Sequence, residues 1–119
     1  DHEYVHKQSA LITEMFPRRH ELFLGDSNTT LPGAIQQGGV QPGILCDLAF
    51  VDGGHSYKTT YNDLSILYSF MKNKSKTILC DDYMDVTYIT EVRAAIDDFT
   101  RKKNLNLEVI KGKFAMIRT

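Results

Sequence analysis

Two short apolar runs, each ending on acidic side chains, constrain the fold of this chain most. Leu48–Val51 is followed by Asp52 and a Gly-Gly turn, and Thr77–Cys80 is followed by Asp81 and Asp82. Runs of this length and composition are typical of buried strands in a parallel sheet. Because ligands bind at the carboxyl ends of such strands, the acids lie where a site is expected.

The segment between the two runs has the periodicity of an amphipathic helix. Its apolar side chains recur every three or four residues, at Tyr57, Tyr61, Leu64, Tyr68 and Met71. A strand, a helix and a second strand in this order normally form two parallel neighbours. We therefore expect the two acidic strand ends to meet at one edge of the sheet.

The remaining segments continue the alternation of helices and strands. We expect a helix ending near Met15, a strand at Glu21–Leu24, a short helix entered at Thr29–Pro32, a helix carrying Ile89, Val92, Ile96 and Phe99, and a hairpin of Leu105–Ile110 and Phe114–Ile117. This order predicts the α/β class: one domain over residues 1–119, with a mostly parallel sheet, helices on both faces and a closing antiparallel hairpin.

The composition is that of an ordinary globular protein. Fourteen basic and fifteen acidic side chains give a formal net charge of -1, which argues against a nucleic-acid partner. No apolar run approaches the roughly 20 residues that cross a bilayer, and nothing resembles a signal peptide. We expect a cytoplasmic protein without a membrane partner.

Asp52, Asp81 and Asp82 are the candidate metal ligands. Neighbouring carboxylates repel one another unless a cation compensates them, and Mg²⁺ prefers oxygen ligands. The alternative is that these acids cap the following helices or are solvated in loops. Three acids at two adjacent strand ends favour a functional role.

His55 is the candidate catalytic base. It follows Asp52 by three residues, within a Gly-Gly turn that lets the backbone approach a ligand closely. Imidazole is a good general base near neutral pH. The alternative is a loop histidine, or one that caps the next helix.

Gly25, Asp26 and Ser27 follow the first expected strand and would lie on the same side of the sheet as the acids. An Asp at this place can accept a hydrogen bond from an amino group of a ligand. Equally, it can do no more than start a turn.

Taken together, the runs Phe23–Ser27, Phe50–Tyr57 and Asp81–Tyr83 resemble the class I S-adenosylmethionine-dependent methyltransferases. Within these, the chain is most similar to methyltransferase family 24 and to metal-dependent sugar O-methyltransferases. The resemblance implies a Rossmann-like sheet and transfer of a methyl group to a small hydroxylated, sugar-like molecule.

The resemblance also implies roles for the candidate residues. Asp26, with Gly25 and Ser27 beside it, would contact the adenine of S-adenosylmethionine. Asp52, Asp81 and Asp82 would bind Mg²⁺, which would hold and acidify the substrate hydroxyl. His55 would remove the hydroxyl proton before the oxygen attacks the sulfonium methyl group.

One part of the family pattern is not found. Such domains begin with a strand, a glycine-rich turn, a helix and a second strand, which in the family's strand order lie between the Phe23 and Phe50 strands. We expect a partial domain that binds the cofactor poorly or not at all. An unpaired strand edge would then favour association between copies.

Two other functions remain open. A non-catalytic fragment or degenerate paralogue would keep the fold as an interaction module. A Mg²⁺-binding, phosphate-handling receiver domain also has an acidic pocket at strand ends. In receiver domains, however, the paired acids come on the first strand and the lone Asp later, whereas this chain has the reverse order.

Overall fold

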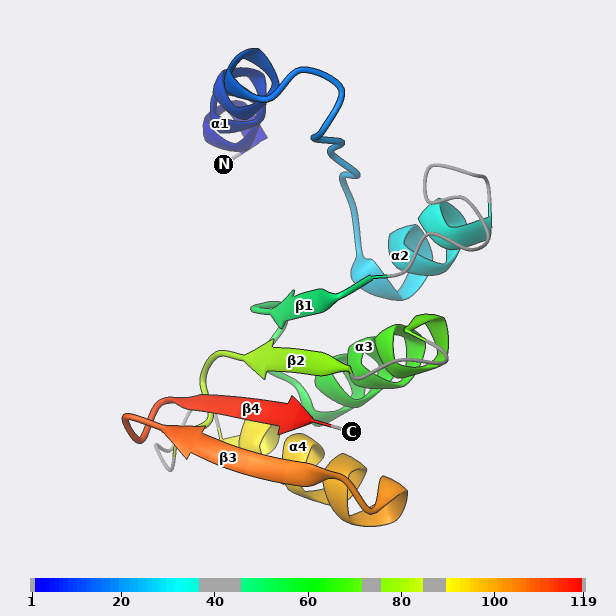
Figure 1. The fold of residues 1–119 in the computed structure, drawn as a ribbon, viewed down its shortest axis with the longest axis vertical. Helices are drawn as coiled ribbons and strands as arrows, with labels where there is room; N and C mark the ends of the chain where they lie inside the picture. Colours follow the sequence, from blue (N-terminus) through cyan, green and yellow to red (C-terminus); the bar gives the residue numbers. More distant parts are fainter. Residues whose placement is uncertain (1, 37–45, 72–75, 85–89, 119) are drawn as a thin grey trace.

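The computed structural model describes residues 2–36, 46–71, 76–84 and 90–118 (Figure 1). The elements, in chain order, are α1 (His2–Met15), α2 (Ser27–Gln36), β1 (Leu48–Val51), α3 (Tyr57–Phe70), β2 (Thr77–Cys80), α4 (Thr90–Lys103), β3 (Asn106–Ile110) and β4 (Phe114–Arg118). None of the described helices is both long and apolar enough to cross a membrane. The α/β class predicted from the sequence is confirmed.

The strands form one sheet in the order β1-β2-β4-β3. β1 and β2 are parallel, with Val51 opposite Cys80, and α3 connects them as predicted. β4 pairs antiparallel with both β2 and β3, so the closing hairpin is also confirmed. Its turn is formed by Lys111 and Gly112, both at positive φ, which is the backbone of a type I′ hairpin turn.

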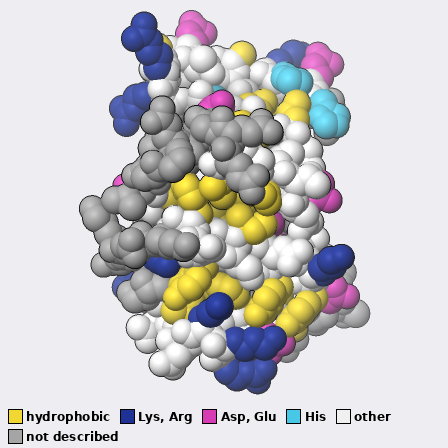
Figure 2. Space-filling view, turned by 90° about the vertical axis from the view of Figure 1, so that its right-hand side faces the viewer, with side chains coloured by type: hydrophobic (Ala, Val, Ile, Leu, Met, Phe, Trp, Pro, Cys, Tyr) yellow, Lys and Arg dark blue, Asp and Glu magenta, His cyan; other side chains and the backbone are white. Residues whose placement is uncertain are grey.

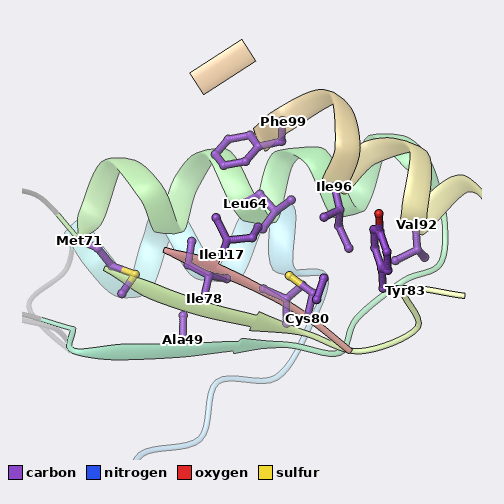
Figure 3. Packing of buried hydrophobic residues seen from close by; sticks show 12 residues of the cluster. Ala49, Leu64, Met71, Ile78, Cys80, Tyr83, Val92, Ile96, Phe99 and Ile117 are labelled. Atoms are coloured by element: carbon purple, nitrogen blue, oxygen red, sulfur yellow. The ribbon is translucent and has the colours of Figure 1, made fainter. Parts of the chain in front are cut away.

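The core lies between the sheet and the helices α3 and α4 (Figure 3). Alternate residues of β1, β2 and β4 point toward these helices and are buried, whereas their neighbours along each strand are less buried. Phe99 of α4 is fully buried and meets the rings of Tyr61 and Tyr68 of α3 edge-on, with both centroid separations 5.7 Å. The apolar stripes of the two helices therefore form one core with the sheet.

Local sequence explains why α3 and α4 form where they do. The Ser56 hydroxyl accepts a hydrogen bond from the amide of Thr59 at 3.1 Å, which caps the start of α3. α4 ends in three basic residues, which complement the negative end of the helix dipole. In Figure 2, basic side chains gather at the lower end of the molecule, where the last turn of α4 lies.

The expected strand at Glu21–Leu24 is wrong. These residues have no regular secondary structure, and Phe23 and Leu24 are exposed. A strand is stable only with a hydrogen-bonded neighbour, and among the described strands β1 is the edge of the sheet on its side. The apolar run therefore crosses the surface as an extended segment between α1 and α2 (Figure 1).

Two further details differ from the expectation. α3 and α4 both cover one face of the sheet, and the opposite face leaves Leu48 and Phe50 largely exposed among the described residues. α1 ends at Met15 as predicted, but none of its residues is buried, and it lies away from the sheet (Figure 1). Its apolar side chains recur at helical spacing, but they pack against no other element in the described part of the chain.

Candidate functional site

The carboxyl ends of β1 and β2 lie side by side, as predicted. The amide of Asp81 donates to the carbonyl oxygen of Val51 at 2.9 Å, which extends the parallel pairing one residue beyond β2. Asp52 follows β1 directly, so the acids after both strands belong to one edge of the sheet. The turns after these strands line a small hollow that includes Asp52, His55, Asp81 and Asp82.

The Asp81 carboxylate is held by two donors. Its Oδ1 accepts the backbone amide of Asp82 at 2.7 Å and lies 3.1 Å from the Nζ of Lys113. The Asp81 side chain is only 15% exposed, whereas that of Lys113 is 46% exposed. The hydrogen bond to Asp81 raises the pKa of Lys113 above its usual range, so the amine is protonated and positively charged at neutral pH.

His55 pairs with the neighbouring acid. Its Nε2 lies 3.0 Å from Oδ2 of Asp82, whose backbone adopts a left-handed conformation with φ of 59°. The His55 ring is about half exposed, so a substrate can reach it from solvent. A proton on Nε2 would be donated to Asp82, which leaves Nδ1 as the nitrogen that can accept a proton.

A larger cavity of about 450 Å³ lies between the segment after α1, helices α2 and α3, and the end of β1. This volume is within the range of small-molecule sites, roughly 300–1,000 Å³. Val51, Asp52 and Gly53 line both this cavity and the acidic hollow. The two spaces therefore adjoin at the carboxyl end of β1.

Comparison with known proteins identifies the family. Residues 1–83 match the family model described as a methyltransferase domain. The chain belongs to the methyltransferase domain family. The match includes the cavity-lining segment after α1, the turn that carries His55, and both acidic strand ends.

The methyltransferase domain also resembles one curated viral protein, the "Uncharacterized protein R132" of Acanthamoeba polyphaga mimivirus. The two are 35% identical over 51 residues, which is 43% of this chain and 23% of the viral protein. The chain thus matches about a quarter of that relative's length.

The cofactor implied by the family, S-adenosylmethionine, fits the cavity in part. Gly25 and Ser27 line the cavity, together with apolar walls from Leu22, Leu31 and Phe50, and their contact with the cofactor stays a prediction. Asp26 does not line it. Its Oδ1 instead accepts hydrogen bonds from the backbone amide and the side-chain amide of Asn28, both at 2.8 Å, at the start of α2. The backbone hydrogen bond from Asn28 lowers the pKa of Asp26, so the carboxylate serves as a helix cap.

The backbone conformation at residue 25 favours glycine, so we can predict how a substitution there changes stability. At φ of 132°, a Cβ on residue 25 would approach Cγ2 of Thr30 to 2.8 Å. We expect Gly25→Ala to lower the free energy of unfolding by about 1–3 kcal/mol, because both the strained backbone and the clash must be accommodated. Urea unfolding followed by circular dichroism measures this change in the free energy of unfolding.

Gly33, which lies within α2, is the matched control. A Cβ there would meet nothing within 4 Å. Gly33→Ala is therefore expected to raise stability by about 0.5–1 kcal/mol through its better helix propensity. Equal effects of the two substitutions would contradict a special role for the backbone at Gly25.

Asp63 is a site residue that the sequence reasoning missed. It lies on the buried face of α3, is only 6% exposed and lines the cavity. Its Oδ1 has no hydrogen-bond partner among the described residues. The signal in the sequence is an acid inside the helical stripe whose buried residues are Thr60, Asp63 and Leu64, where a carboxylate needs a partner.

Burial raises the pKa of Asp63, although a hydrogen bond from Ser27 opposes the rise. A carboxyl whose pKa is raised on folding stabilises the fold most below its ordinary value of 3.8, and this contribution is lost as the pH rises through the folded value. We expect Asp63→Asn to raise the melting temperature more at about pH 7 than at about pH 4. A constant difference between the two proteins would contradict the raised pKa.

The Mg²⁺ that the resemblance implies does not fit the arrangement of the acids. Among the described residues, which include Asp52, Asp81 and Asp82, no group of at least three His, Cys, Asp or Glu side chains has the spacing to hold a metal ion. Instead, Lys113 pairs with the carboxylate of Asp81, and His55 pairs with that of Asp82. The three acids converge on one edge but do not form a cage.

Proposed function

We propose that this methyltransferase domain takes part in transferring the methyl group of S-adenosylmethionine to a hydroxyl oxygen of a small, sugar-like molecule. The observation that carries the proposal is the meeting of two spaces at Asp52 and Gly53. One space has the size for a cofactor, whereas the other, of about 10 Å³, is lined by a histidine and paired acids and is too small for a sugar. A methyl donor in the first space would therefore face an acceptor bound outside the hollow, against the half-exposed ring of His55.

The cavity residues suit the adenosyl part of the cofactor. Apolar walls would contact the adenine ring, and the unpartnered Oδ1 of Asp63 would accept an N–H of the ligand. Gly25, which has no side chain, would let the chain pass close to the ligand, and Ser27 lies beside Asp63. S-adenosylmethionine, when bound, supplies an electrophilic methyl group on a sulfonium centre.

His55 would act as the general base for the acceptor. Its ring is held through Nε2 by Asp82, so that Nδ1 can take the proton of an acceptor hydroxyl. The acceptor oxygen forms its new bond to the methyl carbon as the carbon–sulfur bond breaks, and the proton stays on the imidazole. Mg²⁺ has no part in this proposal, because Lys113 and His55 already pair with the acids.

Amide chemical-shift mapping with S-adenosylhomocysteine tests the proposal. We expect weak binding by this chain, with a dissociation constant on the order of 1 mM, or about 4 kcal/mol. Perturbed amides should include residues 25–27, 51–54 and 63. Shifts confined to the separate hollow between Tyr61 and Tyr68, or no shifts at all, would contradict it.

A non-catalytic role as an interaction module is the second candidate. The observations that favour it are the exposed apolar side chains of α1 and the exposed Leu48 and Phe50 on the open face of the sheet. If the domain is an interaction module, it should associate with itself or with a partner, and Asp63→Asn should leave the affinity of that association unchanged. Analytical ultracentrifugation of both proteins, with and without S-adenosylhomocysteine, distinguishes the two roles.

A further inference from the structure

Lys113 is fixed to the acidic edge of the sheet through both its backbone and its side chain. Its carbonyl oxygen accepts the amide of Tyr83 at 2.8 Å, and its own amide donates to the carbonyl oxygen of Ile110 at 3.1 Å. Its Nζ lies 3.1 Å from Oδ1 of Asp81 and 5.1 Å from the ring centroid of Phe114. The hairpin turn therefore delivers this ammonium to the end of β2.

The strand register explains why residue 113 arrives there. Cys80 pairs with Ala115 in the antiparallel ladder of β2 and β4. Continuing this ladder by two residues places Lys113 opposite Asp82. The type I′ turn at Lys111 and Gly112 reverses the chain tightly at this point.

The charges of the edge are unbalanced without Lys113. Asp52, Asp81 and Asp82 bring three carboxyl groups to two adjacent strand ends, where like charges repel. Lys113 lies 3.1 Å from the Asp81 carboxylate, and the Asp82 carboxylate lies 3.0 Å from His55. Of the described side chains that pair with these acids, Lys113 is the one that carries a permanent positive charge.

We propose that the Lys113 ammonium is the resident cation of the acidic strand ends, and that it takes the position at Asp81 that a divalent metal ion would need. The contact with Asp81 depends on the hairpin, because the register of β2 and β4 brings Lys113 to the end of β2. The acidic edge then carries its compensating charge on the chain itself.

A consequence for catalysis follows, and it rests on the proposed function. The partly exposed ammonium would face the acceptor and stabilise negative charge on its hydroxyl oxygen, the task for which a metal ion is otherwise used. Methyl transfer by this domain would then persist in the presence of a chelator.

Direct Mn²⁺ binding tests the inference without any need for catalysis. Electron paramagnetic resonance of free Mn²⁺ measures binding to the unaltered chain, to Lys113→Met, and to Lys111→Met, a control in the same turn. We expect Lys113→Met to bind Mn²⁺ at least about tenfold more tightly than the other two proteins. Adding Asp81→Asn to Lys113→Met should remove the gain.

Two results would overturn the inference. The first is that the unaltered chain binds Mn²⁺ and that Asp81→Asn abolishes this binding. A metal ion would then displace Lys113 from Asp81. No gain in Lys113→Met, with its circular dichroism spectrum unchanged, would show that the acids offer no cation site. Neither result depends on methyl transfer, so failure of the proposed function is seen separately in the S-adenosylhomocysteine titration.

Discussion

Replacing His55 with Ala is expected to lower kcat for methyl transfer by about 100- to 10,000-fold, the usual contribution of a general base. The ring is oriented by Asp82 at 3.0 Å and is reachable from solvent, so it is placed to take a proton from an acceptor. Transfer of labelled methyl groups from S-adenosylmethionine to a panel of monosaccharides measures the loss. Added imidazole should restore part of the rate, because it can enter the space left by the side chain.

His6→Ala is the matched control for this experiment. His6 lies on α1, whose residues are not buried, and is outside both spaces that adjoin at Asp52. Its replacement should leave the rate unchanged. Loss of activity in both variants, or full activity in His55→Ala, would remove His55 from the role of base.

Phe99→Ala is expected to lower the free energy of unfolding by about 3–5 kcal/mol. The ring is fully buried and touches both Tyr61 and Tyr68 of α3, so truncation leaves a cavity that these aromatic rings cannot fill. Since small domains are stable by only about 5–15 kcal/mol, the variant should be close to unfolding. Thermal unfolding followed by circular dichroism measures the change.

Phe50→Ala provides the comparison on the opposite face of the sheet. Phe50 is 55% exposed, so its replacement should cost less than about 1 kcal/mol. A cost at Phe50 as large as that at Phe99 would mean that the open face of the sheet is covered in solution.

Periodicity made the core of the fold predictable. The apolar runs of β1 and β2 and the stripes of α3 and α4 repeat at the intervals of their elements, and the structure places them as expected. The acids meet because adjacent parallel strands end at the same edge. These features depend mainly on local sequence and on short connections.

The errors arise where structure depends on distant neighbours. Glu21–Leu24 has the composition of a strand, but no strand is described beside it, so the pairing that would fix it is absent. Asp26 caps the helix that follows it, whereas the sequence indicated a ligand contact or a turn; its contact with adenine stays a prediction. The start of α2 is therefore earlier than the Thr29–Pro32 entry suggested.

Two site residues could not be read from local motifs. Asp63 belongs to a helical stripe, and its unpartnered oxygen is visible only once the cavity is formed. Lys113 reaches Asp81 through an antiparallel register between segments about 30 residues apart, which periodicity does not specify. Lys113 pairs with one of the candidate metal ligands, and Asp63 adds an unpartnered carboxylate oxygen to the wall of the cavity.

A crystal structure with S-adenosylhomocysteine tests the central claim most directly. The account predicts the adenosyl group in the cavity beside Gly25 and Ser27, with a ligand N–H in hydrogen-bond reach of Oδ1 of Asp63. The sulfur should face Asp52 and Gly53, on the side of His55. A ligand bound in the hollow of Tyr61 and Tyr68, or one whose sulfur points away from Asp52, would contradict it.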